Sequence, residues 1–280
     1  MAGHHDGRFQ DGLIMSILFF DIDNTLLSHR TFTIPDSALK ALRMAKERGH
    51  RAFISSGRAY DSLKEYLDPE LFDGAIGGSG ACGFVNGEPV FTHFFDNADV
   101  LRVYEIAQKA GAGMSVQSIR TSRMTEYGMD HFRKYAHAGA ERIRKMNSMV
   151  FDPANAGQCC KMDLFFGPEV DYMHVISQLP DTIDQCPSLS VTSEMKGCEL
   201  TPRGVNKAAG AMELAKYLNI DVQDSYAFGD SENDIEIIRA CGTGIAMGNG
   251  AQKVKEAADY VTADIEEDGI YLAMKHFNLI

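Results

Sequence analysis

Acidic residues stand directly after two apolar runs of this sequence. Asp21 and Asp23 follow the run 17–20, and Asp230 follows a second such run. Alternate residues of a strand point the same way, so we expect the carboxylates of Asp21 and Asp23 to face one side and Ile22 to face the core. Since α/β folds place ligands at the C-terminal ends of strands, these carboxylates can share one ligand there.

Two carboxylates in this position predict phosphoryl transfer. Asp21 can attack phosphorus to give an aspartyl-phosphate, and Asp23 can protonate the leaving oxygen and then deprotonate water. The simpler alternative is that residues 21–25 form only a strand-end turn.

The same residues also suit a magnesium ion. Mg²⁺ prefers oxygen ligands and keeps several waters, so we expect Asp21, Asp230 and the backbone carbonyl of Asp23 to bind it beside a substrate phosphate. The side chain of Asp23 then stays available for proton transfer. Alternatively, Ser231 in the motif 229–234 only caps the next helix.

Candidate donors to a phosphoryl group come from two other places in the chain. Ser56 and Gly57 follow the run 52–54, where a hydroxyl and a glycine amide can approach phosphate oxygens closely. Lys207 can hold phosphate and offset its repulsion from Asp21. Considered singly, Ser56 is expected to be a turn residue and Lys207 a solvated helix lysine. Only their place in the ordered set of motifs makes them candidates.

Alternating strand and helix patterns must position these residues. The chain shows, in order, strand 17–20, a helix that opens at Pro35, strand 52–54, helix 60–67 and a strand from Ala75. This alternation predicts an α/β fold with a doubly wound, Rossmann-like parallel sheet. Asn86-Gly87 between two apolar pairs then indicates a hairpin, which a purely parallel sheet does not require.

The middle of the chain departs from this alternation, so we predict an inserted α/β domain over 96–193. Its expected elements are helix 100–110, strand 114–119, an irregular or helical stretch, strand 161–166, helix 170–179 and strand 189–193. The alternation resumes with helix 206–218, strand 225–228, a helix after Asp234, strand 245–247 and helix 270–277. The first domain is therefore discontinuous, over 15–95 and 194–280, and we expect residues 1–14 to be a leader or disordered extension.

Composition limits the classes of partner. The 280 residues, 45% of them hydrophobic, suffice for two domains, and the net charge of -12 argues against nucleic-acid and anionic-membrane partners. The early apolar stretch 13–20 is too short to span a membrane. Six cysteines without paired CxxC spacing indicate reduced thiols, so we expect a cytoplasmic protein.

The ordered motifs resemble the haloacid dehalogenase (HAD) superfamily of phosphatases, and within it the Cof-type branch (subfamily IIB). Further segments that resemble this branch are Gly204 to Lys207, Ile245 to Ala251, Ala258 to Thr262 and Glu267 to Gly269. The resemblance covers nearly all of 15–280. It implies a Rossmann-like core with an inserted cap domain of the C2 type, which closes over the site and sets substrate choice.

The resemblance also assigns roles by position. It implies the roles given above for Asp21, Asp23 and Asp230, and it adds phosphate contacts from the Ile22 backbone and Asn233, with Asp234 as an orienting residue. Three positions depart from the usual pattern: Ser56 replaces threonine, Ser79 stands where asparagine is common, and Ser231 replaces glycine. The first keeps the hydroxyl that phosphate binding needs, whereas Ser79 can alter contacts near the cap.

The implied activity is Mg²⁺-dependent hydrolysis of a small phosphorylated metabolite. A sugar phosphate or a phosphorylated cofactor such as flavin mononucleotide or pyridoxal phosphate would fit, in a monomer or small homo-oligomer. The alternatives are a sugar phosphomutase of the same superfamily and a non-catalytic binding or regulatory module.

A basic region of the predicted cap suggests contacts to a second anionic group of the substrate, or else a solvated basic helix. Its members are Arg120, Arg123, His131, Arg133, Lys134, Arg142, Arg144 and Lys145.

Overall fold

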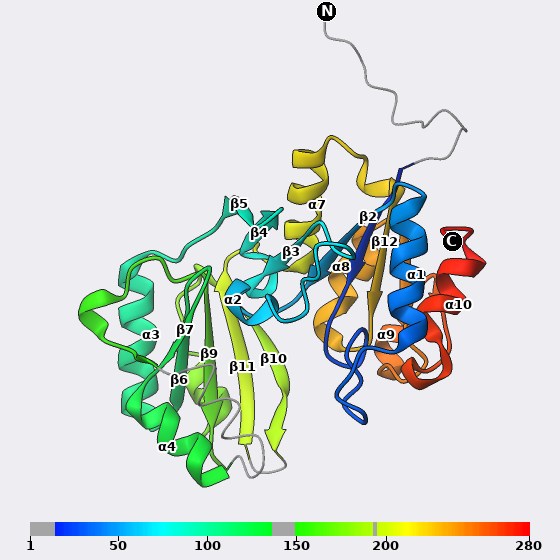
Figure 1. The fold of residues 1–280 in the computed structure, drawn as a ribbon. Helices are drawn as coiled ribbons and strands as arrows, with labels where there is room; N and C mark the ends of the chain where they lie inside the picture. Colours follow the sequence, from blue (N-terminus) through cyan, green and yellow to red (C-terminus); the bar gives the residue numbers. More distant parts are fainter. Residues whose placement is uncertain (1–14, 136–148, 193–194) are drawn as a thin grey trace, which may run out of the picture.

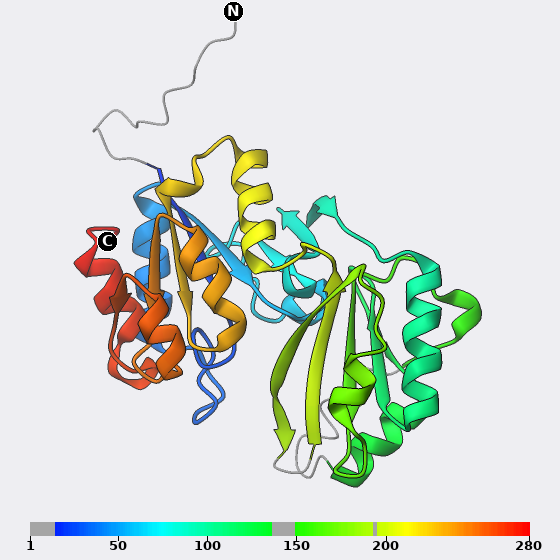
Figure 2. The same ribbon diagram turned by 180° about the vertical axis from the view of Figure 1, so that it is seen from behind.

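Two β-sheets with their own helices make up the protein (Figure 1). The computed structural model describes residues 15–135, 149–192 and 195–280, so the predicted leader lies outside the described residues. The chain crosses from the first sheet to the second after β5 and returns after β11, which places the second unit as an insertion (Figures 1 and 2). Within the described ranges, no helix is long and apolar enough to cross a membrane.

The first sheet has eight strands in the order β14-β13-β12-β1-β2-β3-β4-β5. Its bounds are β1 Ile17–Phe20, β2 Arg51–Ser55, β3 Gly74–Gly77, β4 Cys82–Val85, β5 Glu88–Thr92, β12 Ser225–Gly229, β13 Thr243–Ala246 and β14 Tyr260–Val261. The six strands from β14 to β3 are parallel, and β4 and β5 are antiparallel. The predicted doubly wound parallel sheet is therefore confirmed.

Helices cover both faces of this sheet because its central strand is apolar on both sides. Phe20 of β1 packs with α1 Asp36–Glu47, α2 Tyr60–Leu63 and α10 Gly269–His276. Its neighbour Phe19 packs with α7 Lys207–Leu218, α8 Ile235–Ala240 and α9 Gln252–Ala257 on the opposite face. A strand that is buried on both faces has a continuous run of apolar residues, as residues 17–20 do in this sequence.

A two-residue turn makes the hairpin that precedes the insertion. Asn86 and Gly87 join β4 to β5 with φ values of 51° and 85°. Both are left-handed, as a hairpin turn of this length requires, so the expectation from the Asn-Gly pair is confirmed.

The second sheet has six strands in the order β10-β11-β9-β6-β7-β8. Its strands are β6 Gly113–Gln117, β7 Ser122–Met124, β8 Met149–Val150, β9 Lys161–Phe166, β10 Ile183–Thr192 and β11 Met195–Pro202, with helices α3 Asn97–Ala110, α4 Glu126–Tyr135 and α6 Tyr172–Ile176. One face packs Met162 and Leu164 against α3 and α6 in an apolar core. The other face carries charged residues, including Lys161 and Asp163.

The sequence placed the return to the first domain too early. The sequence pattern predicts that the first domain resumes at residue 194, whereas β11 pairs with both β9 and β10 in the second sheet. The physical reason is that β11 alternates buried apolar residues such as Cys198 and Leu200 with the charged Glu199. A charged residue in the middle of the segment interrupts the apolar pattern from which a strand is predicted.

Candidate active site

Three adjacent strands bring the predicted site residues together. Asp21 follows β1, Ser56 follows β2 and Asp230 follows β12, and these strands are neighbours in the order β12-β1-β2. All three side chains are buried. Residues more than 200 positions apart in the chain thus meet at one sheet edge, because parallel strands end on the same side.

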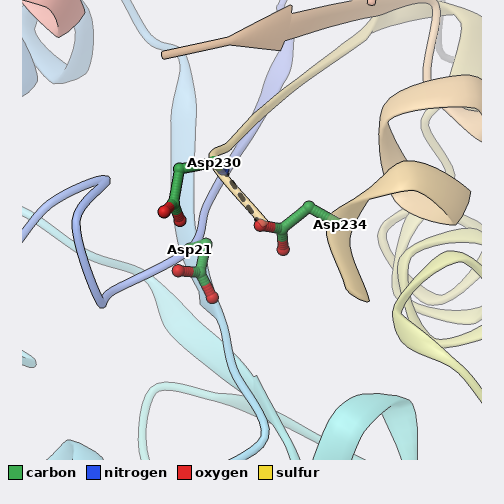
Figure 3. Close-up of side chains that lie close together, drawn as sticks. All are labelled: Asp21, Asp230 and Asp234. Carbon is green, nitrogen blue, oxygen red and sulfur yellow. Dashed lines mark hydrogen bonds between the residues drawn. The ribbon is translucent and has the colours of Figure 1, made fainter. Parts of the chain in front are cut away.

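Three carboxylates form a group that can hold a metal ion. Oxygen atoms of Asp21, Asp230 and Asp234 all lie within 4.8 Å of one another (Figure 3). Oxygens of this kind are the ligands that Mg²⁺ prefers. The donor set therefore fits a magnesium ion.

The third member of this group, Asp234, is already occupied by other contacts. Its Oδ2 accepts hydrogen bonds from the backbone amides of Asp230 and Ser231, each at 3.1 Å, and its Oδ1 accepts from Lys207 Nζ at 2.6 Å. Asp234 therefore holds the loop after β12 in place. This position matches the orienting role that the resemblance implies.

Burial makes the two remaining carboxylates costly to ionise. Burial raises the pKa of Asp230 to about 7, with a further contribution from Asp234. Burial also raises the pKa of Asp21, although Lys207 opposes the shift; Asp234 and Asp230 add to it. The local positive charge does not balance the local negative charge, so this site favours an additional cation.

Lys207 lies at the centre of the site and is fully buried. Its Nζ donates to Asp21 Oδ1 and to Asp234 Oδ1, both at 2.6 Å. Burial alone would lower the pKa of Lys207, but the two carboxylates outweigh it and raise the pKa. As the first residue of α7, Lys207 is fixed by the side chain of Asn206, whose Oδ1 accepts from Ala209 N at 2.8 Å. The alternative of a solvated helix lysine is wrong.

Asp23 does not join the carboxylate group. Its oxygens accept from Arg58 Nη2 at 2.7 and 3.0 Å, and His29 Nε2 lies 2.8 Å from Oδ1. Burial alone would raise the pKa of Asp23, but Arg58 and His29 outweigh it and lower the pKa. β1 ends at Phe20, so strand alternation does not extend to Asp23, and a ligand shared by the side chains of Asp21 and Asp23 stays a prediction.

The remaining predicted phosphate contacts are distributed over three loops. The Ile22 side chain is in the core and its carbonyl accepts from three backbone amides, which makes the turn after β1 tight. Ser56 Oγ accepts from Arg58 N at 3.3 Å. Asn233 Oδ1 accepts from Ser231 Oγ at 2.6 Å in the loop after β12.

A side chain at Gly57 would be crowded by neighbouring polar groups. A Cβ atom at this position would lie 3.0 Å from both Lys161 Nζ and Ser79 Oγ. A backbone that other groups approach this closely is the reason for a glycine here.

Two further residues at the site were not predicted from the sequence. Arg58 pairs with Asp23, and Asn249 holds the turn after it by donating from Nδ2 to the Asn24 carbonyl at 2.8 Å. Asn249 Oδ1 also accepts from Ile265 N at 2.9 Å. Arg58 directly follows the predicted Ser56 and Gly57, and Asn249 lies in the segment Ile245 to Ala251, so nearness to a motif was the available signal.

The proposed basic region does not gather at one point among its described members. Arg120 Nη1 lies 3.8 Å from Asp61, and Lys134 Nζ lies 4.0 Å from Glu169 Oε1. Arg123 lines a cavity of about 150 Å³ that reaches the apolar face of the second sheet. The side chains of His131 and Arg133, and all of Arg142, Arg144 and Lys145, lie outside the described residues.

Comparisons with known proteins agree on one family. The model of the haloacid dehalogenase-like hydrolase family matches residues 18–274. The solved HAD subclass IIB sugar phosphatase BT4131 is 30% identical, with a TM-score of 0.79 over 95% of this chain and 100% of its own. A structure from a study of a trigonal-bipyramidal intermediate in a phosphoryl-transfer superfamily is 29% identical, with a TM-score of 0.80 over 95% and 100%.

A curated relative gives the same result. The 5-amino-6-(5-phospho-D-ribitylamino)uracil phosphatase YitU of Bacillus subtilis is 26% identical over 93% of this chain and 97% of its own length. The chain therefore belongs to the haloacid dehalogenase-like hydrolase family and is an enzyme of the phosphatase type.

Proposed function

We propose that the enzyme hydrolyses small phosphomonoesters through an aspartyl-phosphate on Asp21, with Mg²⁺ as cofactor. The observation that carries the proposal is the buried Lys207, whose ammonium bridges Asp21 and Asp234 beside Asp230. A buried nucleophile that is held by one cation, beside carboxylates that can hold a second cation, suits attack on an anionic phosphorus centre.

The proposed reaction has two displacements. In the first, an Asp21 carboxylate oxygen forms a bond to phosphorus, the ester P–O bond breaks and the leaving alkoxide takes a proton from Asp23. In the second, Asp23 removes a proton from water, the water oxygen attacks phosphorus and the bond to Asp21 breaks. Inorganic phosphate and free Asp21 result.

Asp23 must change its partners to act as the acid. Its pairs with Arg58 and His29 lower its pKa, so the carboxyl group is ionised as it stands. We propose that substrate binding loosens the Asp23–Arg58 pair, since only a protonated carboxyl group can donate to the leaving oxygen.

The other predicted residues bind the cofactor and the phosphoryl group. Asp21, Asp230 and the Asp23 carbonyl would hold Mg²⁺, which supplies positive charge next to the phosphoryl oxygens. Lys207, Ser56 and Asn233 would contact those oxygens with side chains, and Ile22 and Gly57 with backbone amides.

Carbohydrate phosphates are the substrate class that the relatives favour. One solved relative is a sugar phosphatase, and the name of the Bacillus enzyme gives a phosphoribityl substrate. These two share a phosphorylated chain of hydroxylated carbons. We also propose a cytoplasmic location, which the six free cysteines support.

Phosphate release with and without Mg²⁺ tests the function. We expect release from a panel of sugar phosphates, flavin mononucleotide and pyridoxal phosphate, loss of at least about 100-fold in rate after chelation, and recovery on adding Mg²⁺. Equal rates in the chelator and in Mg²⁺ would contradict the cofactor assignment. No release from any compound, p-nitrophenyl phosphate included, would contradict the function.

A further inference from the structure

A cluster of polar side chains, buried or half-buried, lies on the face of the second sheet opposite the one that packs against α3 and α6. Ser115, Gln117, Lys161, Asp163 and Glu199 belong to the adjacent strands β6, β9 and β11, and we call them the polar cluster. In the sheet register Ser115, Asp163 and Glu199 stand directly opposite one another. The opposite face of the same strands is apolar and packs into a core. The stability of the sheet alone would therefore not require polar side chains on this face.

The polar cluster carries a net negative charge. Lys161 Nζ lies 3.0 Å from Asp163 Oδ1 and 3.1 Å from Glu199 Oε1, so two carboxylates share one ammonium. Burial alone would raise the pKa of Glu199, but Lys161 and the hydroxyl of Ser79 outweigh it and lower the pKa. The Glu199 carboxylate therefore offers hydrogen-bond acceptors and no donor, and Asp163 Oδ2 accepts from Ser115 Oγ at 2.7 Å.

The polar cluster touches the loops that carry the candidate phosphate site. Lys161 Nζ donates to the Gly57 carbonyl at 3.2 Å, and Ser79 Oγ donates to Glu199 Oε2 at 2.7 Å. Lys207 is among the charges that affect Glu199. The leaving group of a phosphomonoester bound at Ser56 and Gly57 would therefore lie near this face.

Gln117 provides an acceptor without a partner. Its side chain is 7% exposed, and Nε2 donates to Asp163 Oδ2 at 2.9 Å. Its Oε1 atom is buried and accepts no hydrogen bond from the described part of the chain. An unsatisfied buried acceptor costs about 1–3 kcal/mol, a cost that a donor on a bound molecule would remove.

We propose that the polar cluster recognises the hydroxyl groups of the substrate's leaving alcohol, with Gln117 Oε1, Asp163 and Glu199 as acceptors. This inference rests on the proposed phosphatase function. Lys161 is a positioning residue, because it fixes both carboxylates and the Gly57 carbonyl.

The excess of acceptors favours uncharged polyol or sugar leaving groups, and the net negative charge of the polar cluster disfavours a second phosphate.

Two esters that differ only in hydroxyl groups test the proposal: hexitol 6-phosphate and hexyl phosphate. We expect the wild type to prefer the hexitol ester in kcat/KM, and Glu199→Gln and Gln117→Met each to lower that preference by about tenfold or more, since each removes or weakens an acceptor. Lys196→Ala, an exposed position on the same strand as Glu199, is the matched control and keeps the preference.

Stability separates recognition from a structural role. Gln117→Met removes an unsatisfied buried acceptor along with one hydrogen bond, so we expect little change in Tm. A fall in Tm with an equal loss of kcat/KM for both esters would overturn the proposal, as would an unchanged preference in either variant.

The same assay separates this proposal from the one it rests on. A wild type that cleaves p-nitrophenyl phosphate but does not prefer the hexitol ester overturns the recognition site alone. A wild type that releases phosphate from none of the three overturns both.

Discussion

Lys207 shows at the residue scale why burial matters more than residue type in this site. A lysine at the start of a helix is a common feature of sequences. The ammonium of Lys207, however, is buried between the carboxylates of Asp21 and Asp234. Because buried ions without partners are costly, the three groups stabilise one geometry together. This arrangement depends on contacts between β1, α7 and the loop after β12, which no local pattern reveals.

Removing that ammonium should affect both activity and folding. We expect Lys207→Met to lower kcat by about 100-fold or more, since a charge beside the reacting phosphoryl group is lost. We also expect it to lower the free energy of unfolding by about 3–5 kcal/mol, because two buried carboxylates lose their partner. Lys216→Met, at an exposed position on the same helix, is the control for steady-state kinetics and urea denaturation. Unchanged kinetics in Lys207→Met would refute the role of this ammonium.

The affinity for Mg²⁺ should depend on pH through Asp230. Its pKa is raised to about 7 by burial and by Asp234, so below that pH it carries a proton that the cation must displace. Apparent affinity should therefore fall as pH falls from 8 to 6, by up to about tenfold per pH unit below the pKa. Calorimetric Mg²⁺ titrations at several pH values measure this dependence, and equal affinity at pH 6 and pH 8 would count against it.

Elements join the site through a few close backbone approaches. Gly80, in the turn after β3, has φ +104°, and a Cβ atom there would lie 1.9 Å from the Asn206 carbonyl oxygen. Asn206 caps the helix that begins with Lys207. The turn after β3 thus fixes where the ammonium lies.

Gly80→Ala should therefore shift the position of Lys207, although Gly80 itself does not belong to the site. We expect a loss of about 3 kcal/mol or more in unfolding free energy, from the left-handed backbone and the clash together, and a lower kcat as α7 shifts. Gly204→Ala is a matched control, since that glycine also has positive φ (+79°) but nothing within 4 Å of a Cβ, so strain alone should cost about 1–2 kcal/mol. Equal losses in the two variants, measured by denaturation, would contradict this account.

The elements that the sequence predicted well are those with strong local signals. β1, β2 and β12 are continuous apolar runs, the Asn86-Gly87 turn has a specific backbone requirement, and each motif stands directly after its strand. β11 was not predicted because Glu199, which is half-buried and pairs with the distant Lys161, interrupts the apolar pattern of that strand. The pairing of Asp23 with Arg58 was not predicted either, since 35 positions separate the two residues.

At the scale of the whole molecule, the two sheets contribute different residues to the site. The parallel sheet positions the carboxylates and Lys207 at one edge, and the second sheet contacts the loops at that edge through Lys161 and Glu199. We expect the first unit to determine the reaction and the second unit to determine which leaving group is accepted. Substitutions in the two units should accordingly change kcat and substrate preference separately.

The central claim is that Asp21 forms the bond to phosphorus, and phosphate release by Asp21→Asn tests it most directly. With Mg²⁺ and p-nitrophenyl phosphate, we expect the variant to lose at least about 1,000-fold in kcat while keeping its fold, since an amide is a poor nucleophile. Asp181→Asn, at an exposed aspartate of the second unit, should match the wild type. Wild-type rates of release from Asp21→Asn would contradict the claim.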